Sequence, residues 1–230
     1  MPEPTTQVRV ALFDLDHTLL PLDSDYAWGQ FTSSIGWTDT AEFSRCNEEF
    51  YRHYLAGTLD IAAYVRFATQ ALRQRGPAQA KAAHERFMAE VIAPALREGA
   101  HALLRAHRQA GDKLAIVTAT NEFVTRPIAH ALGVQDLIAT ELARDSSDWI
   151  TGEIAGVPAF RAGKVTRVQQ WLAAQNLNWS STHTTFYTDS INDLPLLEQV
   201  TVPVATNPDA RLLALAQQRN WRVLDLFKDN

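Results

Sequence analysis

A short, mostly apolar run at residues 8–13 constrains the fold most, because it ends abruptly in the acidic sequence Asp14-Leu15-Asp16. The run shows no helical spacing, which is typical of a strand buried on both faces of a parallel sheet. In open α/β sheets, ligands bind at the carboxyl ends of the strands. The two acidic residues therefore fall where a binding or catalytic site is expected.

The segment that follows predicts helices only. From Pro21 to about Leu96 no strand-like run occurs, and apolar residues recur at helical spacing through residues 61–72 and 87–95. Gly76 and Pro77 predict the end of the first of these helices. Because this block directly follows the first strand, we interpret it as an insertion.

After the block the pattern alternates between helices and strands. We expect strands at 113–117, 137–140, 184–187, 200–204 and 221–224, with helices between them and a hairpin within 141–156. Such alternation predicts an α/β protein with a doubly wound parallel sheet. We expect a core domain formed by residues 1–20 and 98–230, and an inserted all-helical cap domain at residues 21–97.

Composition excludes several classes of partner. With 21 Lys and Arg against 26 Asp and Glu, the net charge of −5 argues against binding to nucleic acid or anionic membranes. No apolar run approaches the roughly 20 residues of a membrane span, and no secretory leader is recognisable. The single cysteine, Cys46, allows no intrachain disulfide, so we expect a cytoplasmic protein. The oligomeric state stays open.

Three predicted strand ends carry polar residues in a pattern that suggests chemistry. Residues 13–18 read Phe-Asp-Leu-Asp-His-Thr, residues 117–120 read Val-Thr-Ala-Thr, and residues 188–193 read Thr-Asp-Ser-Ile-Asn-Asp. Carboxylates clustered at one sheet edge would repel one another unless a cation is bound, and an oxygen-only donor set favours Mg²⁺. The alternative is that these acids only cap the helices that follow.

In this order the motifs resemble those of the haloacid dehalogenase superfamily, in the branch that includes phosphoserine phosphatase. Residues 13–19 look like the family's first motif, Thr118 its second, Lys164 in Ala162-Gly163-Lys164 its third, and residues 189–193 its fourth. The helical block resembles the family's first-position cap. The resemblance implies a phosphatase that acts on a small-molecule phosphate ester.

The same resemblance implies the catalytic roles. Asp14 would be the nucleophile that forms an aspartyl phosphate, and Asp16 the general acid and base. The Asp14 carboxylate, the Asp16 backbone carbonyl and Asp189 would hold Mg²⁺.

The remaining motif residues would support these groups. Asp193 would orient the metal site or the catalytic Lys164. Thr118 and Asn192 would donate hydrogen bonds to phosphoryl oxygens.

Asp23 bears on the substrate. It lies nine positions after Asp14, where phosphoserine phosphatases of this branch carry a glutamate that binds the substrate's amine, although Asp23 could instead be a helix N-cap. These relatives also place an arginine six residues before a glycine to bind the serine carboxylate. Counting back from Gly57 gives Tyr51, with Arg52 one position off.

Motif two departs from phosphoserine phosphatases as well, because Thr118-Ala119-Thr120 replaces their Ser-Gly-Gly. A substrate with an amine but no carboxylate is therefore favoured, and histidinol phosphate fits. Two alternatives remain: hydrolysis of phosphoserine, and transfer of the phosphoryl group to another alcohol through the same covalent intermediate.

Overall fold

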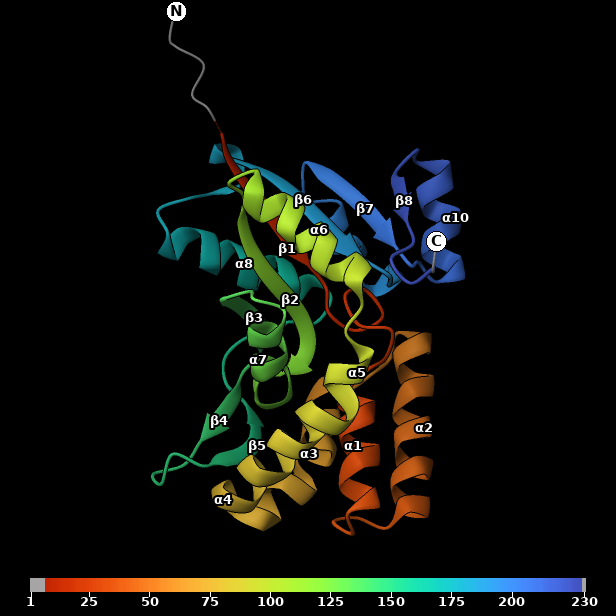
Figure 1. Ribbon diagram of the computed structural model, residues 1–230, viewed down its shortest axis with the longest axis vertical. Coiled ribbons are helices and arrows are strands. Elements are labelled where there is room, and N and C mark those ends of the chain that lie inside the picture. The colour runs from red at the N-terminus through yellow and green to blue at the C-terminus, as the bar shows by residue number, and fades with distance from the viewer. Residues whose placement is uncertain (1–6, 229–230) are drawn as a thin grey trace, which may run out of the picture.

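A six-stranded sheet forms the upper half of the molecule in the computed structural model, which describes residues 7–228 (Figure 1). The strand order is β3-β2-β1-β6-β7-β8, and every neighbouring pair is parallel. The strands are β1 (Val8–Phe13), β2 (Lys113–Asn121), β3 (Asp136–Thr140), β6 (Thr182–Thr188), β7 (Val202–Thr206) and β8 (Arg222–Leu224). The predicted doubly wound α/β class is confirmed.

Helices cover both faces of this sheet. They are α6 (Glu98–Gln109), α7 (Glu122–Ala131), α8 (Ala162–Ala174), α9 (Leu194–Leu197) and α10 (Ala210–Gln218). Alternate residues of β1 enter two separate hydrophobic clusters: Ala11 and Phe13 join the one that contains side chains of α6 and α7, and Val10 and Leu12 the one that contains α8, α9 and α10. This two-sided burial explains the unbroken apolar run in the sequence.

The helical insertion lies below the sheet in Figure 1. It contains α1 (Ser24–Ser34), α2 (Thr40–Ala56), α3 (Ile61–Ala68), α4 (Gln70–Phe87), a π-helical turn (Met88–Ile92) and the short α5 (Ala93–Ala95). Its apolar side chains, among them Trp28 and Phe87, belong to the same cluster as Phe13 of β1. The insertion therefore shares a continuous apolar core with one face of the sheet.

The expected helix end at Gly76 and Pro77 is present as a break within α4, because Gly76 adopts the non-helical angles φ 75° and ψ 172°. Proline is well tolerated in the first turn of a helix, so Pro77 begins the helical segment that follows the break. Two strand boundaries were wrong. The strand expected at 113–117 continues to Asn121. The strand expected at 200–204 is displaced to Val202–Thr206.

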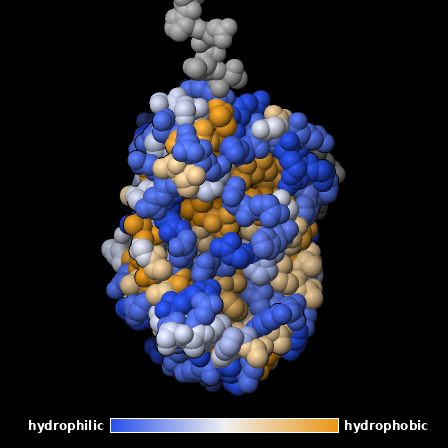
Figure 2. Space-filling view, turned by 90° about the vertical axis from the view of Figure 1, so that its left-hand side faces the viewer, coloured by the Kyte–Doolittle hydropathy of each residue, from blue (hydrophilic) through white to orange (hydrophobic). Residues whose placement is uncertain are grey.

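The predicted hairpin is present as β4 (Leu142–Arg144) and β5 (Ile150–Ile154), an antiparallel pair that lies against α3 and α4 of the insertion. The side of the molecule shown in Figure 2 is largely hydrophilic with smaller apolar patches. Across residues 7–228, no helix is long and apolar enough to cross a membrane.

Candidate active site

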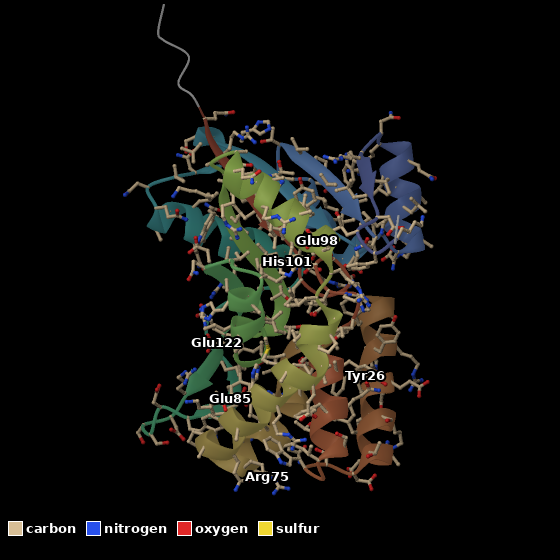
Figure 3. All side chains as sticks on the ribbon, in the orientation of Figure 1. Tyr26, Arg75, Glu85, Glu98, His101 and Glu122 are labelled. Atoms are coloured by element: carbon tan, nitrogen blue, oxygen red, sulfur yellow. The ribbon has the colours of Figure 1, made fainter. Side chains whose placement is uncertain are left out.

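A cavity of about 890 Å³ opens between the carboxyl ends of the central strands and the helical insertion. The insertion contributes part of its wall, including Tyr26 of α1, which Figure 3 labels. Every residue that the sequence motifs singled out lines this cavity: Asp14, Asp16, Asp23, Thr118, Lys164, Asp189, Asn192 and Asp193. Side chains separated by up to 179 positions thus meet at one site because their strands are neighbours in the sheet.

Asp14 and Lys164 form a buried ion pair at the centre of the site. The backbone of Asp14 continues β1, since its N–H donates to the Tyr187 carbonyl of β6. Lys164, in the first turn of α8, places Nζ 2.8 Å from Asp14 Oδ1 and 2.6 Å from Asp193 Oδ2. Burial works against the charged form of Lys164, but the two carboxylates outweigh it and raise the pKa of the ammonium. Lys164 is therefore a permanent cation beside Asp14.

The carboxylate of Asp16 is held at both oxygens. Oδ1 accepts a hydrogen bond from the Ser24 N–H at the start of α1, and Oδ2 accepts one from the Thr120 hydroxyl, each at 2.8 Å. Burial, reinforced by the nearby charge of Asp23, raises the pKa of Asp16 to about 6. A carboxyl group with a raised pKa can carry a proton to a leaving group, as general acid catalysis requires.

Thr120 was not among the predicted site residues. Its position two residues after Thr118, in the same polar strand end, is the signal in the sequence that could have identified it.

Asp14, Thr18 and Asp189 form an oxygen-rich group suited to a hard cation. The Thr18 hydroxyl lies 3.2 Å from Asp14 Oδ2 and 3.3 Å from Asp189 Oδ1, and it accepts a bond from the Asp189 N–H. One hydroxyl proton cannot serve both carboxylate oxygens. Burial, followed by the charges of Asp14 and Asp193, raises the pKa of Asp189 well above its usual range. A divalent cation would relieve this repulsion, so the donor set fits Mg²⁺.

The expected metal set contains two acidic side chains, those of Asp14 and Asp189, together with the main-chain carbonyl of Asp16. Among residues 7–228, no group of three or more His, Cys, Asp or Glu side chains could hold a metal ion. The Oδ2 atom of Asp193 accepts hydrogen bonds from Lys164 and, at 2.7 Å, from the Thr188 hydroxyl. We expected Asp193 to orient either the metal site or Lys164, and its contact is with Lys164.

The two expected phosphoryl donors line the cavity from different elements. Thr118 is buried near the carboxyl end of β2. Its hydroxyl oxygen accepts a hydrogen bond from the Thr120 N–H at 3.2 Å. Its hydroxyl proton can still be donated into the site. Asn192 lies in the 3₁₀ turn before α9, where its Oδ1 accepts from Arg161 Nη2 at 3.2 Å.

Asp23 and Asp25 lie at the wall formed by α1. Asp23 is the N-cap of this helix, with its side chain accepting from the Tyr26 N–H at 2.8 Å, and it also lines the cavity. Asp25 was not among the predicted site residues. It is 6% exposed, accepts from Asn121 Nδ2 at 3.2 Å and also bonds the Tyr64 hydroxyl. Burial and the charge of Asp23 raise the pKa of Asp25 to about 7.

Aromatic and acidic side chains make up much of the remaining lining. Six aromatic side chains line the cavity: Tyr26, Phe50, Tyr51, Tyr54, Tyr64 and Phe160. One of them is Tyr51, which corresponds to the arginine of phosphoserine phosphatases in the count back from Gly57. Arg52 is not part of the lining. Among the described lining residues, Lys164 is the one Lys or Arg, against eight Asp and Glu.

Comparison with known proteins assigns the family. The model of the haloacid dehalogenase-like hydrolases matches residues 11–198. The chain therefore belongs to this family, as its four motifs indicated, and it is an enzyme of the phosphatase class.

Individual relatives extend over nearly the whole chain. A histidinol-phosphatase of Neisseria meningitidis serogroup C is 42% identical over 94% of this chain and 98% of its own length. Phosphoserine phosphatase SerB1 of Mycobacterium tuberculosis is 30% identical over 96% of this chain and 72% of its own.

Solved structures agree with the fold. A Bordetella pertussis protein of unknown function is 49% identical and superimposes with a TM-score of 0.91 over 96% of this chain and all of its own. A phospho-aspartyl intermediate analogue of phosphoserine phosphatase reaches a TM-score of 0.67 at 15% identity, over 97% of this chain and 96% of that one. At that identity the likeness concerns the fold alone.

Proposed function

We propose that this enzyme is a Mg²⁺-dependent phosphatase that hydrolyses histidinol phosphate through an aspartyl-phosphate intermediate. One observation carries the proposal: among the described lining residues the one lysine lies beside Asp14, while the insertion contributes acidic and aromatic side chains to the same cavity. The relative named as a histidinol-phosphatase, at 42% identity, supports the same substrate.

In the first step we propose that a carboxylate oxygen of Asp14 attacks phosphorus while the bond from phosphorus to the substrate alcohol breaks. Lys164 holds Asp14 Oδ1 at 2.8 Å and the Thr18 hydroxyl lies 3.2 Å from Oδ2, so both oxygens of the proposed nucleophile are held in place. Forming a covalent intermediate replaces one difficult displacement by two easier ones.

Asp16 is the proposed proton donor and acceptor. Its carboxyl group donates a proton to the departing alkoxide, and in the second step the resulting carboxylate takes a proton from water. That water attacks phosphorus, the bond to Asp14 breaks, and inorganic phosphate leaves. The hydrogen bonds from Ser24 and Thr120 support this role because they restrict the rotation of the Asp16 carboxyl group.

Bound Mg²⁺ would neutralise charge on the carboxylates and on the phosphoryl oxygens. The Asp14 and Asp189 carboxylates, with the Asp16 backbone carbonyl, are the proposed ligands. Thr118 and Asn192 are the proposed hydrogen-bond donors to the phosphoryl group, and Asp193 the residue that orients Lys164.

The leaving group would occupy the wall formed by α1 to α3. An imidazole with an amine can stack on aromatic rings and carry positive charge, which suits a wall of acids and aromatics. A serine leaving group would bring a carboxylate into the same acidic surroundings, where none of the described lining residues is an arginine that could pair with it, which argues against phosphoserine. We propose that residues 21–97 act as a cap that selects the leaving group.

The substrate can be tested by measuring kcat/KM of the wild-type enzyme in Mg²⁺ and ranking four compounds by it: histidinol phosphate, phosphoserine, phosphoethanolamine and a generic aryl phosphate. We expect histidinol phosphate to rank first, and a first rank for phosphoserine would overturn this part of the proposal. Release of stoichiometric inorganic phosphate without an added alcohol distinguishes hydrolysis from phosphoryl transfer. Asp14→Asn should leave only a trace of activity on the aryl phosphate.

The cysteine content of the chain bears on its cellular location. The single cysteine, Cys46, is free, which suits a reducing compartment, and we propose that the enzyme is cytoplasmic. Cell fractionation with detection of the enzyme would test this, and recovery from a secreted fraction would overturn it.

A further inference from the structure

Arg161 has a backbone conformation that is unusual for its residue type. It precedes α8, three positions before Lys164, with φ 53° and ψ −123°. Residues with a Cβ rarely adopt positive φ, and such residues persist where surrounding contacts hold them, often next to active sites. A glycine here would be unstrained, so the arginine side chain must provide something that glycine cannot.

That side chain joins the helical insertion to the fourth motif. Nη1 donates to the Gly57 carbonyl at 2.7 Å, Nη2 donates to Asn192 Oδ1 at 3.2 Å, and the guanidinium carbon lies 5.1 Å from the centre of the Phe160 ring. Gly57 ends α2 in the left-handed conformation, with φ 75°. A Cβ at position 57 would lie 2.6 Å from Arg161 Nη2, so only glycine leaves room for this contact.

The chemistry of the two side chains sets the orientation of the Asn192 amide. A guanidinium group has donors and no acceptor, so it can bond only the oxygen of the amide. With Oδ1 bound to Arg161, the Nδ2 group must point away from Arg161. Asn192 lines the cavity, and the Tyr54 hydroxyl, itself 3.0 Å from Ser190 Oγ, bonds its side chain.

We propose that Arg161 is a positioning residue that directs the amide nitrogen of Asn192 toward the phosphoryl group, and that it does so while the C-terminal end of α2 is docked on it. The proposal rests on the role given to Asn192 under the proposed function. It adds a link between the insertion and the phosphate end of the site: if Gly57 moves away, Arg161 loses one of its two anchors. The insertion then influences phosphate binding as well as the choice of leaving group.

Replacement by glycine separates this role from a structural one. Arg161→Gly removes the guanidinium and also relieves the positive φ, so we expect the melting temperature to be equal to or above that of the wild type. Removing one donor at a reacting centre lowers kcat by about 10²- to 10³-fold, and misdirecting a donor that is still present should have a smaller effect. We expect kcat/KM for an aryl phosphate to fall about 10-fold.

Two further variants complete the test. Gly57→Ala should displace the Arg161 side chain and lower kcat/KM in the same way. The double variant that combines Gly57→Ala with Arg161→Gly should be no less active than the less active of the two single variants, because both substitutions act through one contact. Arg161→Lys should recover part of the activity, since one ammonium can replace one of the two donors. Arg66→Ala is the matched control, because it breaks an exposed 3.3 Å ion pair with Glu153 that also joins the insertion to the hairpin, away from the cavity.

The outcomes are distinct. Activity of Arg161→Gly within twofold of wild type, or losses in Gly57→Ala and Arg161→Gly that add fully, would overturn the positioning role. A parallel fall in melting temperature and activity in Arg161→Gly, without recovery in Arg161→Lys, would also overturn it. The aryl phosphate readout does not depend on histidinol phosphate being the substrate. If Asp14→Asn retained activity, the proposed function itself would fail, whatever Arg161 does.

Discussion

Lys164 Nζ lies between Asp14 and Asp193, 2.8 Å from one carboxylate and 2.6 Å from the other, and all three side chains are buried. One ammonium group thus fixes the proposed nucleophile and is itself fixed by a second acid. Lys164→Met would leave two carboxylates buried without their cation. Breaking a buried ion pair from one side costs about 3–5 kcal/mol, so we expect a loss of this order in the free energy of unfolding, measured in urea.

The same variant should lose at least about 100-fold in kcat/KM toward an aryl phosphate, because the described lining of the cavity would then contain no lysine or arginine to face the phosphate. Lys81→Met, on the exposed surface of α4, is the matched control and should change neither quantity. Retention of full activity by Lys164→Met would contradict the proposed site.

Thr120 holds the proposed general acid through its 2.8 Å bond to Asp16 Oδ2. Thr120→Val removes the hydroxyl at nearly constant shape. General acid catalysis matters most for poor leaving groups in the first step, which kcat/KM reports, so we expect kcat/KM for an alkyl phosphate to fall about 10-fold and kcat/KM for an aryl phosphate with a good leaving group to change much less. Equal losses on both substrates would indicate a general distortion of the site instead.

Asp25 should make stability depend on pH. Its pKa is about 7 in the folded protein, where burial and the charges of Asp23 and Asp16 raise it and bonds from Tyr64 and Asn121 lower it. Because its ordinary pKa is 3.8, the folded state keeps a proton that the unfolded chain loses between about pH 4 and 7. The contribution of Asp25 to the free energy of unfolding therefore falls as pH rises through this window.

Asp25→Asn removes this dependence. Relative to wild type, the variant should gain stability as pH rises from 4 to 8, by an amount on the order of a few kcal/mol. If Asp25 also faces the cationic leaving group, the variant will lose preference for histidinol phosphate over an aryl phosphate. Asp39→Asn, the exposed N-cap of α2, is the control for both measurements. A constant stability difference across this pH range would show that Asp25 keeps an ordinary pKa.

Metal binding can be measured without turnover. If Asp14 and Asp189 hold Mg²⁺, millimolar Mg²⁺ should raise the melting temperature of wild type, since a ligand that binds only the folded state stabilises it. Asp189→Asn should abolish most of this shift, and chelation with EDTA should abolish hydrolysis. Asp39→Asn, at the exposed N-cap of α2 and away from the cavity, serves as the comparison variant. An unchanged Mg²⁺ shift in Asp189→Asn would remove Asp189 from the proposed ligands.

Local sequence predicted the elements that depend on local physics. The apolar run before Asp14 specified a strand buried on two faces, and the positions of Asp14, Thr118 and Asp189 after strands placed them at one sheet edge because parallel strands end together. Gly76 and Pro77 also marked a helix end correctly, since the backbone of Gly76 is non-helical and interrupts α4. Local spacing did not give the end of β2, which continues past the expected residue 117 to Asn121 and pairs there with Thr140 of β3.

What the amino-acid sequence determined by itself was the fold class, the family and the acids at the strand ends, because strand pattern and motif order are properties of the chain. The tertiary structure decided which of Asp23 and Asp25 is buried, which hydroxyl holds Asp16, and that Arg161 meets Asn192 and Gly57. These contacts join residues 31 to 104 positions apart, and their geometry comes from how the helical insertion packs on the sheet. Side-chain spacing along the chain carries no information about that packing, which is why no motif revealed them.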